Sequence, residues 1–196
     1  CRTRKTKKVK IMNSYCYSWQ AELSDEHCEA IKALYIEGKP KEAEIGNVAS
    51  IDKNVRSSNI LPCEYDSENG AYLNRIMNQY ITMANRECFG VQLNGFQEFQ
   101  IAKYSKGDFY DYHMDSNIFD NSSQRKLSIT VQLSDSIDYV GGDFEFSKDM
   151  GKLDKKKLRE KGTILVFPSF VYHRVTEVIK GDRFSLVGWY EGNDWV

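Results

Sequence analysis

The sequence has no long apolar run, few prolines and no excess of either charge. No stretch approaches the roughly 20 apolar residues that a membrane-spanning helix needs. Only 3 of its 196 residues are proline, while 13% are aromatic and 41% are hydrophobic, which excludes a disordered chain and can supply one sizeable core. The 27 Lys and Arg nearly balance the 28 Asp and Glu, so the net charge is −1. This balance argues against nucleic acid or a membrane surface as the main partner.

The sequence also lacks the paired cysteines of a zinc site or a disulfide framework. Its five cysteines are an odd number, and none of them forms a CxxC or CxxH pair. We therefore expect small buried thiols in a reducing compartment, which favours an intracellular, cytoplasmic location. The five are Cys1, Cys16, Cys28, Cys63 and Cys88.

The first ten residues carry six positive charges, and no apolar segment of the kind found in a secretory signal follows them. This run is typical of a solvated arm, and the alternative is a weak contact with an acidic partner. We expect residues 1–20 to form a basic N-terminal arm and lead-in, and residues 21–196 to form a single domain.

Two helices are predicted in the first half of the chain. The first follows the cap Ser24 and runs toward Gly38. The second covers residues 68–88 and ends at Gly90, with an apolar stripe that we interpret as core. That stripe consists of Tyr72, Ile76, Tyr80, Met83 and Ala84.

The second half changes to the two-residue alternation of β-strands. The clearest case is residues 127–134, where Leu, Ile and Val alternate with Ser, Thr and Gln. Further strands are predicted at 55–61, 96–104, 144–146, 163–167, 172–178 and 183–190. The pattern indicates a mainly β fold, a sandwich or small barrel with supporting α-helices on one side. Residues of about 21–95 would supply the helical support, and about 96–196 the β core.

Three residues in the second half can form a metal site. The sequence has only three histidines, and we expect one of them, His27, to lie on the surface of the first helix. His113 and Asp115 are two residues apart, so on a strand both side chains point to one face. His173 lies on a later strand that could return beside the first. Two histidines and one carboxylate form the facial triad of non-haem Fe(II) oxygenases, although chance and core packing produce many such triples.

A basic residue near this triad points to an anionic ligand. On a strand, Arg183 and Ser185 would share one face with Val187 and Trp189. A buried guanidinium needs an anionic partner, and its planar fork matches a carboxylate. That partner can be a bound carboxylate or a structural Asp or Glu, and spacing alone leaves both readings open.

Four motifs extend these observations. They are VRSS from Val55, YSKGDFYDYHMD from Tyr104, LSD with GGDFEF from Leu133 to Phe146, and KGTILVFPSFVYHRVTEVIKGDRFSLVGWY from Lys161. With them the sequence resembles the Fe(II)- and 2-oxoglutarate-dependent dioxygenases of the prolyl 4-hydroxylase-like branch, over residues 55–191.

This resemblance implies a double-stranded β-helix (jelly-roll) core and a set of site residues. The iron ligands of the family map onto His113, Asp115 and His173. The anchor for the distal carboxylate of 2-oxoglutarate maps onto Arg183, assisted by Ser185. The remaining residues implied for cosubstrate contacts are Tyr104, Thr130 and Gln132, and those implied for substrate contacts are Arg56, Arg125 and Trp189.

The resemblance also implies the reaction and its components. Family members use Fe(II), 2-oxoglutarate and O2, and ascorbate supports many of them. They release succinate and CO2 while hydroxylating a C–H bond. Asp115 favours hydroxylation, because halogenating relatives carry a small residue there. Collagen-type enzymes usually carry Lys where this chain has Arg183, which leaves the substrate more open than the reaction.

We expect the substrate to be a prolyl residue in a peptide or protein. The nucleic-acid-repair relatives carry a second Arg where this chain has Trp189, so we expect neither nucleic acid nor a membrane as a partner. Two alternatives stay open. One is hydroxylation of a free amino acid or another small molecule, and the other is a non-catalytic jelly-roll binding module.

Overall fold

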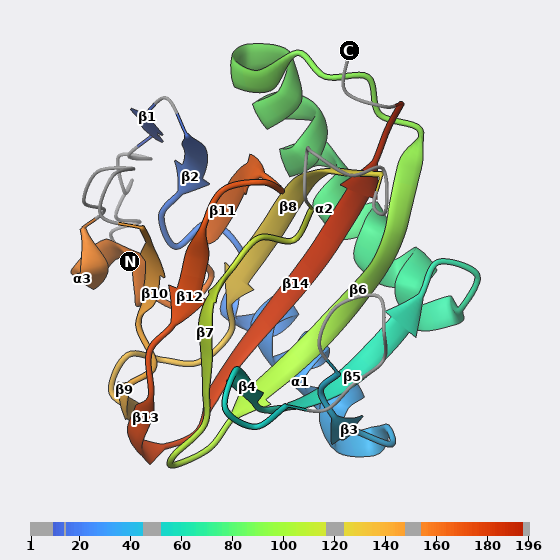
Figure 1. Ribbon diagram of the computed structural model, residues 1–196. Helices are drawn as coiled ribbons and strands as arrows, with labels where there is room; N and C mark the ends of the chain where they lie inside the picture. The colour runs from blue at the N-terminus through green and yellow to red at the C-terminus, as the bar shows by residue number, and fades with distance from the viewer. Residues whose placement is uncertain (1–9, 14, 45–51, 117–123, 148–153, 194–196) are drawn as a thin grey trace, which may run out of the picture.

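The computed structural model describes residues 10–13, 15–44, 52–116, 124–147 and 154–193 (Figure 1). Its first half contains β1 (Lys10–Asn13), β2 (Cys16–Trp19), α1 (Asp25–Glu37), β3 (Lys41–Glu42), β4 (Arg56–Ser57), β5 (Asn59–Glu64), α2 (Glu68–Ala84) and the π-helical turn η2 (Asn85–Phe89). Its second half contains β6 (Gly95–Tyr104), β7 (Phe109–His113), β8 (Arg125–Gln132), β9 (Tyr139–Gly141), β10 (Phe144–Phe146), α3 (Lys155–Leu158), β11 (Ile164–Pro168), β12 (His173–Val175), β13 (Val178–Gly181) and β14 (Arg183–Glu191).

Two antiparallel sheets face each other, as the sequence pattern predicts. The major sheet has eight strands in the order β1-β2-β11-β8-β14-β6-β5-β3, and the minor sheet has four in the order β10-β12-β7-β4. Figure 1 shows α1 and α2 behind the major sheet, with β7 and β12 in front of it. The expected mainly β, jelly-roll fold with helices on one side is confirmed.

The alternating strand β8 shows how the sequence sorts its two faces. Leu127, Ile129 and Val131 are fully buried in the core cluster between the major sheet and the helices. Ser128 and Thr130, on the opposite face, are also buried, but they point between the two sheets. The prediction that the apolar face packs under the helices is confirmed, and the polar face is left for the site.

The predicted helices exist, but the buried face of α2 is wider than the predicted stripe. The Ser24 hydroxyl accepts a hydrogen bond from the His27 amide and begins α1, as expected. Of the predicted stripe, Tyr80 and Ala84 are buried, and Tyr72 and Ile76 are partly buried against the core. Leu73, Met77 and Ile81, each one residue beyond a predicted position, are buried as well. Met83, which we expected in the core, is 37% exposed. Apolar residues occupy two adjacent faces of α2, so periodicity alone does not decide which face packs on the sheet.

The first half contributes more strands than helical support requires. Residues 55–61, predicted as one strand, form β4 in the minor sheet and the start of β5 in the major sheet. Within the expected lead-in, Cys16–Trp19 is the buried strand β2, which pairs with β11. Among the described residues, no helix is long and apolar enough to cross a bilayer.

Candidate active site

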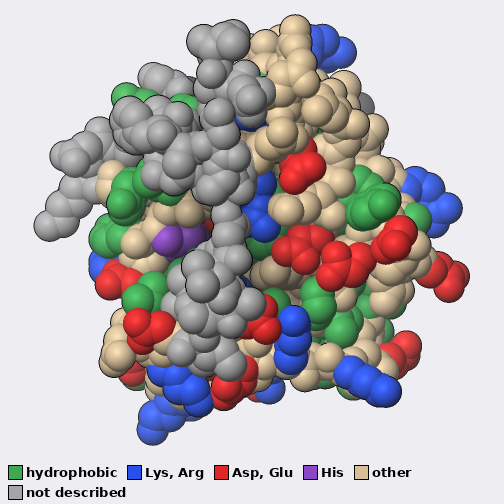
Figure 2. All heavy atoms as spheres, turned by 45° about the vertical axis from the view of Figure 1, so that its right-hand side comes forward, with side chains coloured by type: hydrophobic (Ala, Val, Ile, Leu, Met, Phe, Trp, Pro, Cys, Tyr) green, Lys and Arg blue, Asp and Glu red, His purple; other side chains and the backbone are tan. Residues whose placement is uncertain are grey.

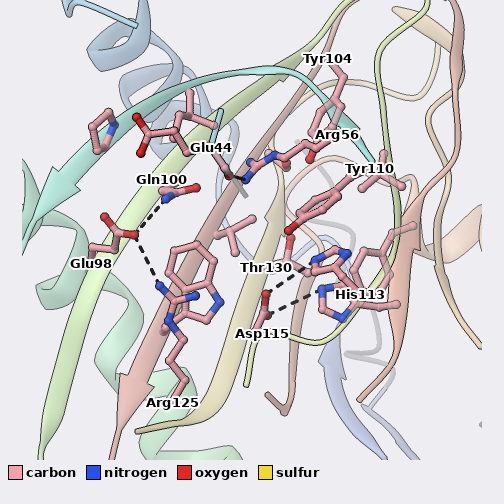
Figure 3. A pocket seen from close by; sticks show the side chains of 18 of the residues that line it. Glu44, Arg56, Glu98, Gln100, Tyr104, Tyr110, His113, Asp115, Arg125 and Thr130 are labelled. Carbon is pink, nitrogen blue, oxygen red and sulfur yellow. Dashed lines mark hydrogen bonds and ion pairs between the residues drawn. The ribbon is translucent and has the colours of Figure 1, made fainter. Parts of the chain in front are cut away.

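A cavity of about 420 Å³ lies between the two sheets. Its walls come from β5, β6, β8 and β14 of the major sheet, and from β4, β7 and β12 of the minor sheet. Figure 2 shows a histidine side chain at the surface on this side of the molecule, with acidic side chains gathered beside a hollow. Figure 3 shows the side chains that point into the cavity.

The structure brings His113, Asp115 and His173 together at one end of this cavity. One potential ligand atom from each of them lies within 4.8 Å of the other two. The Nε2 atoms of both imidazoles are 3.7 Å from oxygens of Asp115. His113 and His173 are direct partners in the antiparallel pairing of β7 with β12, so the later strand does return beside the first.

Backbone carbonyls fix the orientation of both imidazoles. The Nδ1 of His113 hydrogen-bonds the carbonyl of Asp111 at 2.8 Å, and the Nδ1 of His173 hydrogen-bonds that of Val171 at 2.8 Å. Each Nε2 therefore faces the Asp115 carboxylate with its lone pair free for a cation. Burial, and then the neighbouring His173, lower the pKa of His113 to about 3, so this ring is neutral at physiological pH.

Two serines to which the sequence assigned no role hold Asp115, Ser128 at its carboxylate and Ser169 at its backbone amide. The Ser128 hydroxyl donates to Asp115 Oδ2 at 2.6 Å and lies 3.0 Å from the Ser169 hydroxyl. The Asp115 amide donates to the Ser169 carbonyl at 2.8 Å. Burial raises the pKa of Asp115, but His173, His113 and the Ser128 hydrogen bond together hold that pKa below its usual value. The two-residue alternation of β8 places Ser128 on the polar face of that strand, and this was the sequence signal that could have identified it.

Arg183 lies deeper in the same cavity and has only neutral partners. Its side chain is 3% exposed. Its Nε donates to Gln132 Oε1 at 3.1 Å, one terminal nitrogen donates to the Ser185 hydroxyl at 3.4 Å, and its guanidinium lies 5.6 Å from the centre of the Tyr104 ring. None of the described carboxylates forms an ion pair with it. No described Asp or Glu therefore serves as a structural partner of Arg183.

The polar residues expected around Arg183 divide into two groups. Tyr104, Thr130 and Ser185 line the cavity, as expected. Gln132 lies behind Arg183 instead, where its Nε2 donates to the Tyr139 hydroxyl and the Ser134 carbonyl, each at 3.0 Å. It does not line this cavity in the described structure, because the Arg183 guanidinium stands between. We expected Gln132 to point into this cavity, and the structure corrects that expectation.

Arg56, Arg125 and Trp189 also line the cavity. The Arg125 guanidinium stacks 3.9 Å from the ring centre of Trp189, donates to Gln97 at 2.6 Å and pairs with Glu98 at 3.7 Å. The Trp189 Nε1 is buried without a hydrogen-bond partner in the described structure. Arg56 is 4.5 Å from the ring centre of Tyr110, a residue within the YHMD-containing motif that the sequence analysis did not single out.

Comparison with known proteins identifies the family to which this arrangement belongs. Residues 99–191 match the model of the 2OG-Fe(II) oxygenase superfamily. The match covers 93 of the 196 residues of the chain. The matched segment contains the triad His113, Asp115 and His173, and it also contains Arg183 and Ser185. The superfamily uses Fe(II), 2-oxoglutarate and O2.

Curated relatives are similar over just under half of this chain. A PKHD-type hydroxylase of Synechococcus sp. (strain CC9605) is 38% identical over 92 residues, which cover 46% of this chain and 40% of that protein. A PKHD-type hydroxylase of Idiomarina loihiensis is 33% identical over 91 residues, with the same coverage of each chain. The matched part thus spans about two fifths of the length of these relatives.

Solved structures share the fold over nearly the whole chain. A Pseudomonas putida prolyl-4-hydroxylase superposes with a TM-score of 0.71 at 22% identity, covering 91% of this chain and 93% of that one. A prolyl hydroxylase from Trichoplax adhaerens, in complex with a hypoxia inducible factor peptide fragment, gives a TM-score of 0.74 at 18% identity, covering 92% and 84%. With these findings, the resemblance to the prolyl 4-hydroxylase-like branch is confirmed.

Proposed function

We propose that this chain is an Fe(II)- and 2-oxoglutarate-dependent dioxygenase that hydroxylates a prolyl residue of a peptide or protein and releases succinate and CO2. One observation carries the proposal: a His-Asp-His cluster and a buried guanidinium without a carboxylate partner among the described residues face the same cavity. The first group is suited to a divalent metal, and the second to an organic acid.

The residues present fit both groups. Two imidazole nitrogens and one carboxylate oxygen form the donor set typical of non-haem Fe(II), which leaves further positions on the metal open. Arg183 can hold a carboxylate with two parallel hydrogen bonds, and the adjacent Ser185 hydroxyl can add a third. An uncompensated buried charge is costly, so a bound carboxylate also stabilises the protein around Arg183.

Each part of the chain has a defined task in this reaction. When bound, iron and 2-oxoglutarate supply the activation of dioxygen and the oxidising power. The carbonyls of Asp111 and Val171 hold the two imidazoles, and Ser128 holds the Asp115 carboxylate, so the ligand atoms are set before the metal arrives. Arg183 orients the cosubstrate, while the two sheets keep bulk water from the reacting centre.

The walls of the cavity support a prolyl substrate. Tyr110 beside His113 and Trp189 beside Arg125 present aromatic rings, against which an apolar pyrrolidine ring can pack. The names of the structural neighbours describe prolyl hydroxylases, and one of those was solved with a peptide fragment. Because Cys28 and Cys63 are free thiols, we also propose a reducing, intracellular setting.

Succinate formation tests the reaction. The protein is mixed with Fe(II), ascorbate and 2-oxoglutarate, with and without proline-containing peptides, and succinate and a peptide mass gain of one oxygen are followed. We expect both products in the wild type and neither in His113→Ala. Wild-type protein that binds no metal and yields no succinate would instead indicate the non-catalytic binding module.

The same screen separates the two substrate classes. Free L-proline and other free amino acids are tested beside the peptides under the same conditions. Oxygen gain on a free amino acid, with none on any peptide, would replace the prolyl-peptide proposal by the small-molecule alternative. The reaction class would be unaffected by that result.

A further inference from the structure

Arg56 is a second buried guanidinium in the cavity, and its partners are neutral. Its side chain is 8% exposed. Its Nε donates to the Ser58 hydroxyl at 3.0 Å, and one terminal nitrogen donates to the Glu44 carbonyl at a long 3.4 Å. Its planar face lies 4.5 Å from the ring centre of Tyr110. No described carboxylate pairs with it, so its positive charge is balanced only by dipoles and a π face.

The other arginines that contact buried parts of the structure have carboxylate partners. Arg125 pairs with Glu98, Arg159 with Asp143 at 2.7 Å, and Arg174 with Glu145 at 2.7 Å. In the described structure, only Arg56 and Arg183 combine burial with the lack of such a partner. An unpaired buried charge lowers stability, so its presence at a cavity wall indicates a ligand that completes it.

The two unpaired guanidiniums stand on opposite walls. Arg183 belongs to β14 of the major sheet, whereas Arg56 belongs to β4 at the edge of the minor sheet. Arg56 is the direct strand partner of Tyr110, and the Tyr110 ring stacks on His113 with centroids 3.5 Å apart. Figure 3 shows Tyr110 between Arg56 and His113. An anion on Arg56 would thus lie near the triad.

We propose that Arg56 binds a carboxylate of the substrate. This inference rests on the proposed function and narrows its substrate class to molecules that carry a carboxylate next to the hydroxylated residue. Two sources supply the same chemistry. One is an acidic side chain adjacent in a peptide, and the other is the C-terminal carboxylate of a peptide or amino acid.

The assignment of Arg56 is tested by measuring how substrate probes bind to a complex that cannot catalyse the reaction. The full chain is loaded with Mn(II) and N-oxalylglycine, so that the triad and Arg183 are occupied, and affinities are measured by isothermal titration calorimetry. One arm compares N-acetyl-L-proline with N-acetyl-L-prolinamide. The second arm compares the amidated dipeptides N-acetyl-Pro-Asp and N-acetyl-Pro-Asn. We expect the acid to bind at least about tenfold more tightly than its amide in one arm, which identifies the source.

Variants assign the preference to Arg56. Arg56→Gln should abolish the preference for the acid and leave the affinity for N-oxalylglycine within about twofold. Arg56→Lys keeps the charge but loses the fork, so it should retain a reduced preference, and it also serves as a folding control. The matched control is Lys41→Gln, which removes a cation at the mouth of the same cavity and should leave the preference unchanged.

The possible failures can be told apart. Equal affinity for acid and amide in both arms, no binding of either probe, or an unchanged preference in Arg56→Gln would each overturn the Arg56 assignment. A wild type that binds neither Mn(II) nor N-oxalylglycine would contradict the proposed function instead.

Discussion

Tyr110 and His113 stack face to face, with ring centroids 3.5 Å apart and planes inclined by 13°, although both lie on β7. Residues three apart on a regular strand point to opposite faces. Here three steps on β7, from Tyr110 to His113, oppose two steps on β12, from Val175 to His173. This bulge turns both rings into the cavity, and bulges of this kind often re-aim side chains next to active sites.

Removing the Tyr110 ring should therefore weaken metal binding. Tyr110→Ala frees one face of His113, so we expect a roughly tenfold loss in affinity for Mn(II), in the range known for residues that orient metal ligands. Tyr110→Phe keeps the stacked ring and should stay within about twofold of the wild type. Calorimetric titration of the metal measures both. Equal affinities for the alanine variant and the wild type would show that the stack does not position His113.

Gln132 should act on the cosubstrate through Arg183. Its Oε1 accepts from Arg183 Nε, and its own Nε2 is held by Tyr139 and Ser134. Gln132→Ala should raise the Kd for 2-oxoglutarate by roughly tenfold, because the guanidinium loses the hydrogen bond that fixes its fork. The affinity for Mn(II) should be unchanged.

The control for Gln132 is another glutamine of the same molecule. Gln100 lines the cavity but bonds to Glu98, away from Arg183. Gln100→Ala should leave 2-oxoglutarate binding as it is. Equal losses in both variants would indicate a general disturbance of the cavity rather than positioning of Arg183.

Gly188 should not tolerate a side chain. It is the direct partner of Phe99 across β14 and β6, and an added Cβ would overlap the Phe99 ring. Because Phe99 is fully buried, we expect Gly188→Ala to lower the free energy of unfolding by about 1–3 kcal/mol. Denaturant unfolding measures this loss. Phe99→Leu in the same chain should recover part of it, and strict additivity of the two changes would contradict the overlap.

The buried thiols should make the protein less stable in alkali. Burial raises the pKa of Cys16 to about 12 and the pKa values of Cys28 and Cys63 to about 11, from an ordinary value of 9.0. Above pH 9 the unfolded chain loses these protons while the folded chain keeps them. Stability therefore falls as the pH rises from 9 toward 11, by up to about 1.4 kcal/mol per pH unit for each thiol.

A single substitution isolates one thiol in this slope. The slope of unfolding free energy between pH 9 and 10 should become shallower in Cys63→Ala, by up to about 1.4 kcal/mol per pH unit, because one thiol ionisation is removed. Denaturant titrations at several pH values give the slope directly. An unchanged slope would show that Cys63 ionises equally in the folded and unfolded chain.

Local patterns in the sequence predict much of this fold. The alternation in β8 and the cap at Ser24 are both confirmed, because each depends on neighbouring residues that the sequence displays directly. His113 and Asp115 do line one cavity, although β7 ends at His113 and Asp115 lies beyond the strand on which the two-residue spacing placed it. The expected surface position of His27 is also confirmed.

The remaining features depend on contacts between distant segments. The buried face of α2 is chosen by the sheet that it covers, and Met83 shows that the helix sequence alone permits a different choice. That no described carboxylate pairs with Arg183 depends on the placement of Asp and Glu residues far from it in the sequence. The stack of Tyr110 on His113 requires a bulge in the pairing of β7 with β12, and no motif in β7 predicts that bulge.

The placement of β14 has a consequence for how the protein is made. Of the described strands it is the last in the sequence, yet it pairs with β6 on one side and β8 on the other. Until the ribosome releases residues 183–191, the sheet can exist only as two halves, each with an unpaired edge open to aggregation. The same strand carries Arg183, so a nascent chain that has not closed its sheet also lacks the residue that we propose as the anchor for 2-oxoglutarate.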